Sequence, residues 1–127
     1  DLPAATRQSD ALCKAVAALS HDVRERGIAA LATTGETVKL LSKYRPETTI
    51  FAITACEKLY NKMAFYHNVL PIKANCSAEK LDGDMLSGIL LKEKLVKSGD
   101  ELICLYGIRD ASDGKKWHPQ SVSLIRV

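Results

Sequence analysis

The chain has 127 residues, of which 46% are hydrophobic and 26% charged, a composition typical of one globular domain with its own core. Its formal net charge is +3, and the Lys and Arg residues are scattered, which argues against a nucleic-acid-binding surface. No apolar run approaches the ~20 residues of a membrane span, and no signal peptide is recognised, so we expect a cytoplasmic protein without a membrane partner.

The cysteines indicate reduced thiols rather than a disulfide framework or a zinc site. Cys13, Cys56, Cys76 and Cys104 form no C-x-x-C pair, and none has a histidine at zinc-finger spacing. Cys56 and Cys104 lie at the edge of or within apolar runs, where a reduced cysteine is expected to pack as a small hydrophobic residue. We expect no metal site in this chain.

The first part of the chain predicts a linker followed by a helix. Residues 1–9, DLPAATRQS, are interpreted as a linker, and the domain is expected to span 10–127. Over 10–26, apolar residues recur at the spacing of one helix face. Ser9 or Asp10 could cap the start of this helix, and Gly27 is expected to mark its end.

Two strands and two helices are predicted next. The runs IAALAT (28–33) and TIFAIT (49–54) are continuously apolar, as expected of strands that are covered on both faces. A short helix is expected over 37–44, because Pro46 prevents its continuation. A further helix is expected over 57–67.

The second half of the chain predicts an edge strand, a helix and a final pair of strands. The segment VLPI (69–72) contains Pro71, which cannot donate a ladder hydrogen bond, so this strand is expected at a sheet edge. The remaining elements are expected, in chain order, as a helix over 77–96, a turn over 97–100, a strand over 101–107, a polar loop over 108–119 and a strand over 120–127.

This alternation of helices and strands predicts an α/β fold. We expect a three-layer α/β/α arrangement with a mixed five-stranded sheet. The first three strands should be parallel and joined by right-handed crossovers, and the last strand should return as an antiparallel partner.

Small polar residues follow the first predicted strand, where ligands bind to parallel sheets. Gly35 can let backbone N–H groups converge, Thr33, Thr34 and Thr37 add hydroxyl donors, and the next helix adds the positive end of its dipole. These groups could hold a phosphate. On local chemistry alone, a helix cap at Thr34 and a turn at Gly35 explain the pattern better.

The segment ALATTGETVKLLSKYRPETTIFAIT (30–54) resembles the C-terminal domain of pyruvate kinase. In that family a strand ending in T-x-[ST]-G-[RE]-[ST] leads to a helix, the tripeptide Y-R-P and a strand like I-x-A-[IV]-T. Residues 44–46 and 50–54 match the tripeptide and the second strand. The segment GDELICLYG (99–107) resembles a further strand of the family, and the resemblance spans roughly 10–127.

The resemblance implies a mixed five-stranded sheet with the last strand antiparallel. It also implies a parent enzyme that transfers phosphate from phosphoenolpyruvate to ADP with Mg²⁺ and usually K⁺. The parent's catalytic groups lie in other domains, so this chain alone should be inactive. In the family this domain holds a homotetramer together and often binds a sugar-phosphate effector. The loop 33–37 would hold one effector phosphate, and the loop 108–119 would close over the sugar.

Departures from the family pattern affect the effector site. Glu36 follows the loop glycine where effector-responsive members commonly have Arg or a small residue. An ungapped count places Asp82 and Asn75 where the family often has Arg and Trp. A carboxylate about 4 Å from a phosphate costs roughly 1–4 kcal/mol. We therefore expect a phosphorylated metabolite other than fructose 1,6-bisphosphate, or weak binding of that compound.

The predicted closing loop also departs from the family, which often has a glycine-rich turn there. Lys115 and Lys116 could supply positive charge, and Trp117 could stack on a ring. A solvated loop whose tryptophan packs locally explains the same residues equally well.

The remaining sequence features concern a possible catalytic triad, a subunit interface and rival functions. The triplet Ser20-His21-Asp22 cannot act as a hydrolase triad on a helix, because neighbouring side chains point about 100° apart.

Segments 10–26 and 120–127 are the candidate subunit interface. The rival hypotheses are a stand-alone α/β module that binds a small phosphate compound and, less favoured, a redox enzyme based on Cys56.

Overall fold

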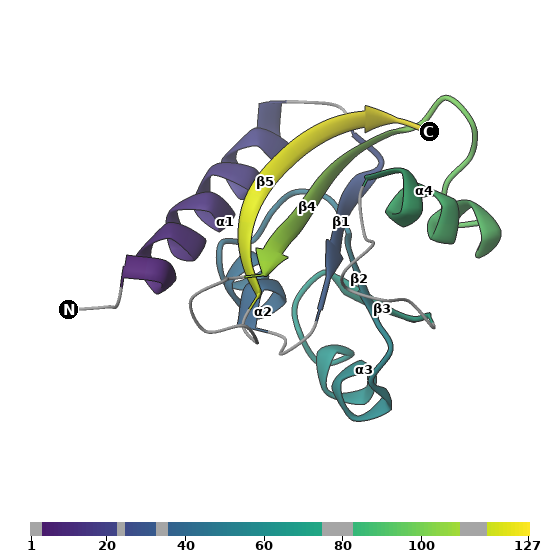
Figure 1. Cartoon of the computed structure of the whole chain (residues 1–127). Helices are drawn as coiled ribbons and strands as arrows, with labels where there is room; N and C mark the ends of the chain where they lie inside the picture. Colours follow the sequence, from purple (N-terminus) through teal and green to yellow (C-terminus); the bar gives the residue numbers. More distant parts are fainter. Residues whose placement is uncertain (1–3, 23–24, 33–35, 75–82, 110–116) are drawn as a thin grey trace.

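The computed structural model describes residues 4–22, 25–32, 36–74, 83–109 and 117–127 (Figure 1). These residues form four helices and five strands. In chain order the elements are α1 (Ala4–Asp22), β1 (Gly27–Leu31), α2 (Glu36–Lys43), β2 (Ile50–Thr54), α3 (Glu57–Met63), β3 (Val69–Lys73), α4 (Gly83–Lys92), β4 (Glu101–Arg109) and β5 (Trp117–Arg126).

A single mixed sheet organises the fold, with the strand order β3-β2-β1-β4-β5. β1 pairs in parallel with both β2 and β4, so that Ile28 faces Ile50 on one side and Ile103 on the other. β3 is a parallel edge strand in which Pro71 pairs with Ala52, and β5 runs antiparallel to β4. The predicted parallel strands, proline-containing edge and antiparallel last strand are confirmed.

Helices cover both faces of this sheet, which confirms the three-layer arrangement (Figure 1). One buried cluster joins residues of α1, α2 and α3 to one face, and a second joins α4 to the other. Along β1, Ile28 and Ala30 belong to the first cluster and Ala29 to the second, because successive strand residues point to opposite faces. This double burial explains why the strand reads as a continuous apolar run.

The first helix differs from its predicted bounds at both ends. It begins at Ala4, so Ser9 and Asp10 lie inside it and the predicted cap is wrong. The Asp10 carboxylate instead accepts a hydrogen bond of 2.6 Å from the hydroxyl of Tyr44, the residue that follows α2. The helix also ends at Asp22 rather than at residue 26. By Arg26 the backbone already pairs with β4, since its N–H donates to the Glu101 carbonyl at 2.7 Å.

Two other helices end earlier than predicted. α3 ends at Met63 rather than at residue 67, and Asn68 adopts a left-handed backbone with φ 58° while its amide donates to the Pro46 carbonyl at 3.2 Å. α4 ends at Lys92 rather than at residue 96, because Lys94 also adopts a left-handed backbone, with φ 60°. The predicted start of this helix at residue 77 lies outside the described residues.

The last two strands are longer than predicted, over 101–109 and 117–126 instead of 101–107 and 120–127. Their pairing continues through a register shift at Tyr106 and Gly107, so the predicted loop over 108–119 is shorter than expected. Among the cysteines, Cys104 packs in the core as predicted, whereas Cys56 is exposed and the prediction of a packed Cys56 is wrong.

Two glycines predict opposite effects of added methyl groups. At Gly27 a Cβ would collide with the Phe51 ring and lie 2.9 Å from the Thr49 carbonyl oxygen. A Cβ at exposed Gly88 would have no atom within 4 Å apart from the backbone of α4 itself and the adjacent residues. We expect Gly27→Ala to lower the free energy of unfolding by about 1–3 kcal/mol through overpacking. Gly88→Ala should raise it by about 0.5–1 kcal/mol through helix propensity. Urea denaturation measures both, and a destabilising Gly88→Ala would contradict the α4 assignment.

The buried thiols predict a pH dependence. Burial raises the pKa of the Cys13 and Cys104 thiols to about 12, with smaller contributions from Asp10 and Asp84 respectively. Unfolded thiols ionise near 9.0, so the folded state holds more protons between pH 9.0 and about 12. The free energy of unfolding should therefore fall as pH rises through that window.

Thiol labelling tests the burial of these cysteines, on which the pH dependence rests. In a Cys76→Ser background, exposed Cys56 should react with a disulfide reagent at neutral pH in the folded chain. Cys13 and Cys104 should react only after denaturant is added. Cys56→Ser should leave stability nearly unchanged, and rapid labelling of all three thiols in the folded chain would contradict the structure.

Candidate functional site

The candidate site lies along the edge of the sheet where the parallel strands end. Because β1, β2, β3 and β4 run in the same direction, their carboxyl ends meet at this edge, and antiparallel β5 begins there. β1 occupies the centre of the sheet, as the phosphate-site hypothesis requires. This is the edge at which ligands generally bind to parallel sheets.

The junction between β1 and α2 contains the start of the predicted phosphate loop. Ala32 is buried, and its N–H donates to the Ile53 carbonyl at 2.8 Å, which ties the junction to β2. Thr33, Thr34 and Gly35 lie outside the described residues. The predicted donors are therefore represented in the structure by Thr37 and by the first turn of α2.

Thr37 lies in the first turn of α2 and is half-buried. Its carbonyl accepts a hydrogen bond from the Cys13 thiol of α1, with the sulfur 3.7 Å from the oxygen. Glu36 opens the same turn and is exposed. Its carboxylate suits the positive end of the helix dipole, and for that reason it competes with a bound anion.

The neighbouring junction between β2 and α3 is already occupied by contacts within the chain. The buried Thr54 hydroxyl oxygen accepts from the Cys56 N–H at 3.1 Å, and the Thr54 carbonyl accepts from the Ala74 N–H at 2.9 Å. The Lys73 ammonium lies 3.7 Å from the Glu57 carboxylate at the start of α3. These contacts engage the polar groups at the β2–α3 junction with partners within the chain.

The predicted closing loop is attached to the same edge. Arg109, the last residue of β4, pairs with Trp117, the first residue of β5, and β4 is the neighbour of β1. The topology therefore brings the end of β1 and the start of the closing loop to adjacent strands. Lys115 and Lys116, like Asn75 and Asp82, lie outside the described residues.

Hydrogen bonds explain why the triplet Ser20-His21-Asp22 does not form a hydrolase triad. The Ser20 hydroxyl donates to the Ala17 carbonyl at 2.6 Å and accepts from the Glu47 N–H at 3.1 Å, so it is fully engaged in the helix and the loop before β2. His21 pairs instead with the Glu47 carboxylate at 3.3 Å. In this arrangement the serine cannot act as a nucleophile.

The described residues provide neither a metal site nor a membrane-spanning helix. No group of three His, Cys, Asp or Glu side chains within them could hold a metal ion. None of the helices in these segments combines the length and the apolar character needed to cross a bilayer.

Comparison with known proteins gives one consistent family. The family model "Pyruvate kinase, alpha/beta domain" matches residues 10–116. Pyruvate kinase of Thermoplasma acidophilum is 31% identical over 96 residues, which cover 76% of this chain and 18% of that protein. Plastidial pyruvate kinase 2 of Arabidopsis thaliana is 35% identical over 96 residues, covering 74% of this chain and 16% of that protein.

Solved structures show the same fold. A pyruvate kinase from Cryptosporidium parvum superimposes with a TM-score of 0.74 at 24% identity, covering 93% of this chain and 22% of that one. This chain spans less than a fifth of the length of the two sequence relatives named above. The chain therefore belongs to the pyruvate kinase family and corresponds to its C-terminal α/β domain.

Proposed function

We propose that this chain is the regulatory and assembly domain of a pyruvate kinase. The parent enzyme would transfer phosphate from phosphoenolpyruvate to ADP with Mg²⁺ and K⁺ bound in its catalytic part, and this domain alone would be inactive. The observation that carries the proposal is the junction between central strand β1 and α2, at the carboxyl edge of a parallel sheet. A cytoplasmic location stays a prediction, because the matched relatives include proteins named as plastidial.

The regulatory part of the proposal assigns an effector phosphate to the loop 33–37. The first turn of α2 presents the positive end of the helix dipole, and Thr37 adds a hydroxyl at the same place. Glu36 lies in that turn and opposes dense negative charge. The site would therefore hold a phosphorylated metabolite with one phosphate better than fructose 1,6-bisphosphate. Lys115, Lys116 and Trp117 are the proposed closing residues.

A titration with sugar phosphates tests the effector site. We expect Trp117 fluorescence to change on adding sugar monophosphates and to change little with fructose 1,6-bisphosphate. Thr37→Val, which removes the hydroxyl but keeps the shape, should weaken binding by roughly twofold to tenfold. Glu36→Gln should strengthen it by a similar factor, because it removes the opposing charge. Tight fructose 1,6-bisphosphate binding contradicts the specificity, and a flat response to every compound contradicts the effector role.

The assembly part of the proposal assigns the subunit contact to α1 and β5. β5 is an edge strand of the sheet, and Leu124 within it is 50% exposed. An edge strand with an exposed apolar side chain invites antiparallel pairing with the same strand of a second copy. The two-fold contact would give a dimer of this domain and, with the parent's other contacts, a tetramer.

Light scattering at increasing concentration tests the assembly. We expect the 127-residue chain to form dimers and Leu124→Lys to remain monomeric, because a charge at the contact opposes pairing. Leu70→Lys is the matched control, since Leu70 is a similarly exposed leucine on the opposite edge strand, β3. A chain that stays monomeric at high concentration, or equal effects of the two substitutions, would contradict the β5 interface.

A further inference from the structure

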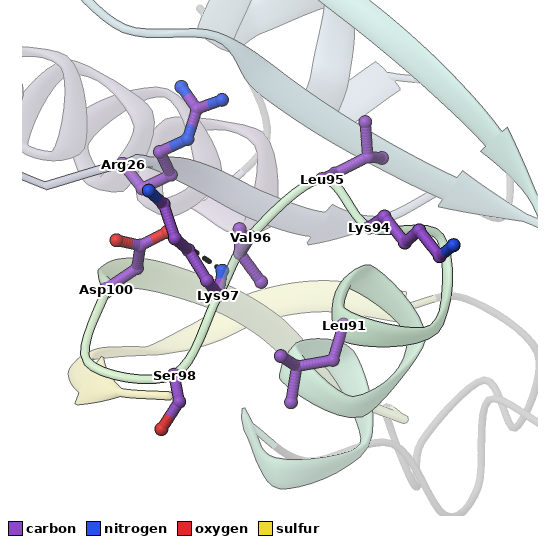
Figure 2. Close-up of a pocket in the computed structure, with 8 residues that line it drawn as sticks. All are labelled: Arg26, Leu91, Lys94, Leu95, Val96, Lys97, Ser98 and Asp100. Carbon is purple, nitrogen blue, oxygen red and sulfur yellow. Dashed lines mark hydrogen bonds between the residues drawn. The ribbon is translucent and has the colours of Figure 1, made fainter.

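A pocket of about 440 Å³ lies at the opposite edge of the sheet, beside the amino ends of β1 and β4 (Figure 2). Arg26 directly precedes β1, and Asp100 directly precedes β4. The rest of the lining comes from the end of α4 and the turn that follows it. The pocket is therefore separated from the start of α2 by the length of the strands.

Backbone hydrogen bonds hold the walls of this pocket in place. The Lys97 N–H donates to the Asp100 carboxylate at 3.0 Å, and the Asp100 N–H donates to the Lys97 carbonyl at 3.0 Å. The Gly99 N–H donates to the Val127 carbonyl at 2.9 Å, which ties the turn to the end of β5. Since Arg26 is bonded to Glu101, the same framework positions both sides of the pocket.

The lining combines positive charge with apolar surface. Arg26, Lys94 and Lys97 contribute three cations, and none of them pairs with a carboxylate in the segments that the structure describes. Asp100 is the one acidic residue of the lining, and one of its oxygens accepts from the backbone of the turn. The nearby Glu101 is neutralised by Arg126 at 3.2 Å. The pocket thus carries an excess of two positive charges.

Apolar side chains separate the cations. Leu91, Leu95 and Val96 line the pocket, and Leu91 is 41% exposed. Figure 2 shows Arg26 and Lys97 toward one end and Lys94 toward the other. A ligand that places an anionic group at one end and an apolar body along the leucines would match both kinds of surface.

The backbone of Lys94 is a second feature that points to a ligand at this pocket. The Leu95 N–H donates to the Leu90 carbonyl and the Lys94 N–H to the Leu91 carbonyl, both at 3.0 Å, which is the Schellman arrangement that ends a helix. The left-handed position in this motif normally belongs to glycine, because a side chain there is strained. At this position the chain has a lysine with φ 60°, at a cost in stability, and this lysine is one of the residues that line the pocket.

We propose that this pocket binds a small organic anion that joins one phosphate or carboxylate group to an apolar body. Arg26 and Lys97 at one end attract the anionic group, Lys94 adds positive charge at the other end, and Leu91, Leu95 and Val96 contact the apolar part. The site is independent of the effector loop, because it shares no residue with 33–37.

Phenyl phosphate is the probe, with inorganic phosphate and phenol as its separate halves. Amide NMR shifts of the ¹⁵N-labelled 127-residue chain should move at Arg26 and over 94–100 and saturate with a Kd on the order of 1 mM. Each half should bind at least about tenfold more weakly. Benzoate in place of phenyl phosphate distinguishes a carboxylate site from a phosphate site, and binding of either supports the proposal.

Substitutions separate binding from folding. Lys94→Gly should raise the melting temperature by about 2–5 °C and yet weaken binding roughly threefold to tenfold, which a purely structural lysine would not do. Lys97→Gln and Arg26→Gln should weaken binding to a similar degree. Lys58→Gln, at an exposed position of α3, is the matched control and should change neither.

Three results would overturn the proposal. The first is the absence of saturable shifts at Arg26 and 94–100. The second is equal weakening by Lys58→Gln, which would make the attraction a property of the net charge. The third is a response confined to the first turn of α2, which would place the anion at the effector loop and leave the pocket without a ligand role.

Discussion

Parallel pairing of β1 on both of its sides is the constraint on which the rest of this domain depends. Ile28 pairs with Ile50 in β2 and with Ile103 in β4, and the strand is buried on both faces. Because β2 and β4 run parallel to it, each needs a crossover that carries the chain back over the sheet. Helices on both faces follow from that requirement, and so does the gathering of the carboxyl ends at one edge.

The sequence could predict this framework because its signals are local. The runs around Ile28 and Ile50 are continuously apolar, and Pro71 restricts its strand to an edge, so strand type and edge position could be read from a few residues. Helix ends were less predictable. α1 begins in a polar segment without an apolar stripe and ends where Arg26 bonds to Glu101, a partner far along the chain. α3 ends near Asn68, whose amide contacts Pro46.

The residues proposed to bind ligands were also only partly predictable from the sequence. The pattern around Gly35 was found because one short segment contains it, and the family resemblance gave it a meaning that local chemistry did not. The pocket beside Arg26 was missed because its lining comes from separate segments. A glycine after α4 would have marked a helix end, whereas Lys94 gives no such signal for its left-handed backbone. Such a site becomes visible only when the segments are placed in space.

The bond between Val127 and the turn before β4 has a mechanical consequence. Val127 accepts from the Gly99 N–H and donates to the Asp100 carbonyl, at 2.9 and 2.8 Å. Two bonds to adjacent residues oppose both rotation and separation of the end of the chain relative to the turn. A force applied along β5 by a neighbouring molecule would therefore be transmitted directly to the wall formed by Lys97 and Asp100.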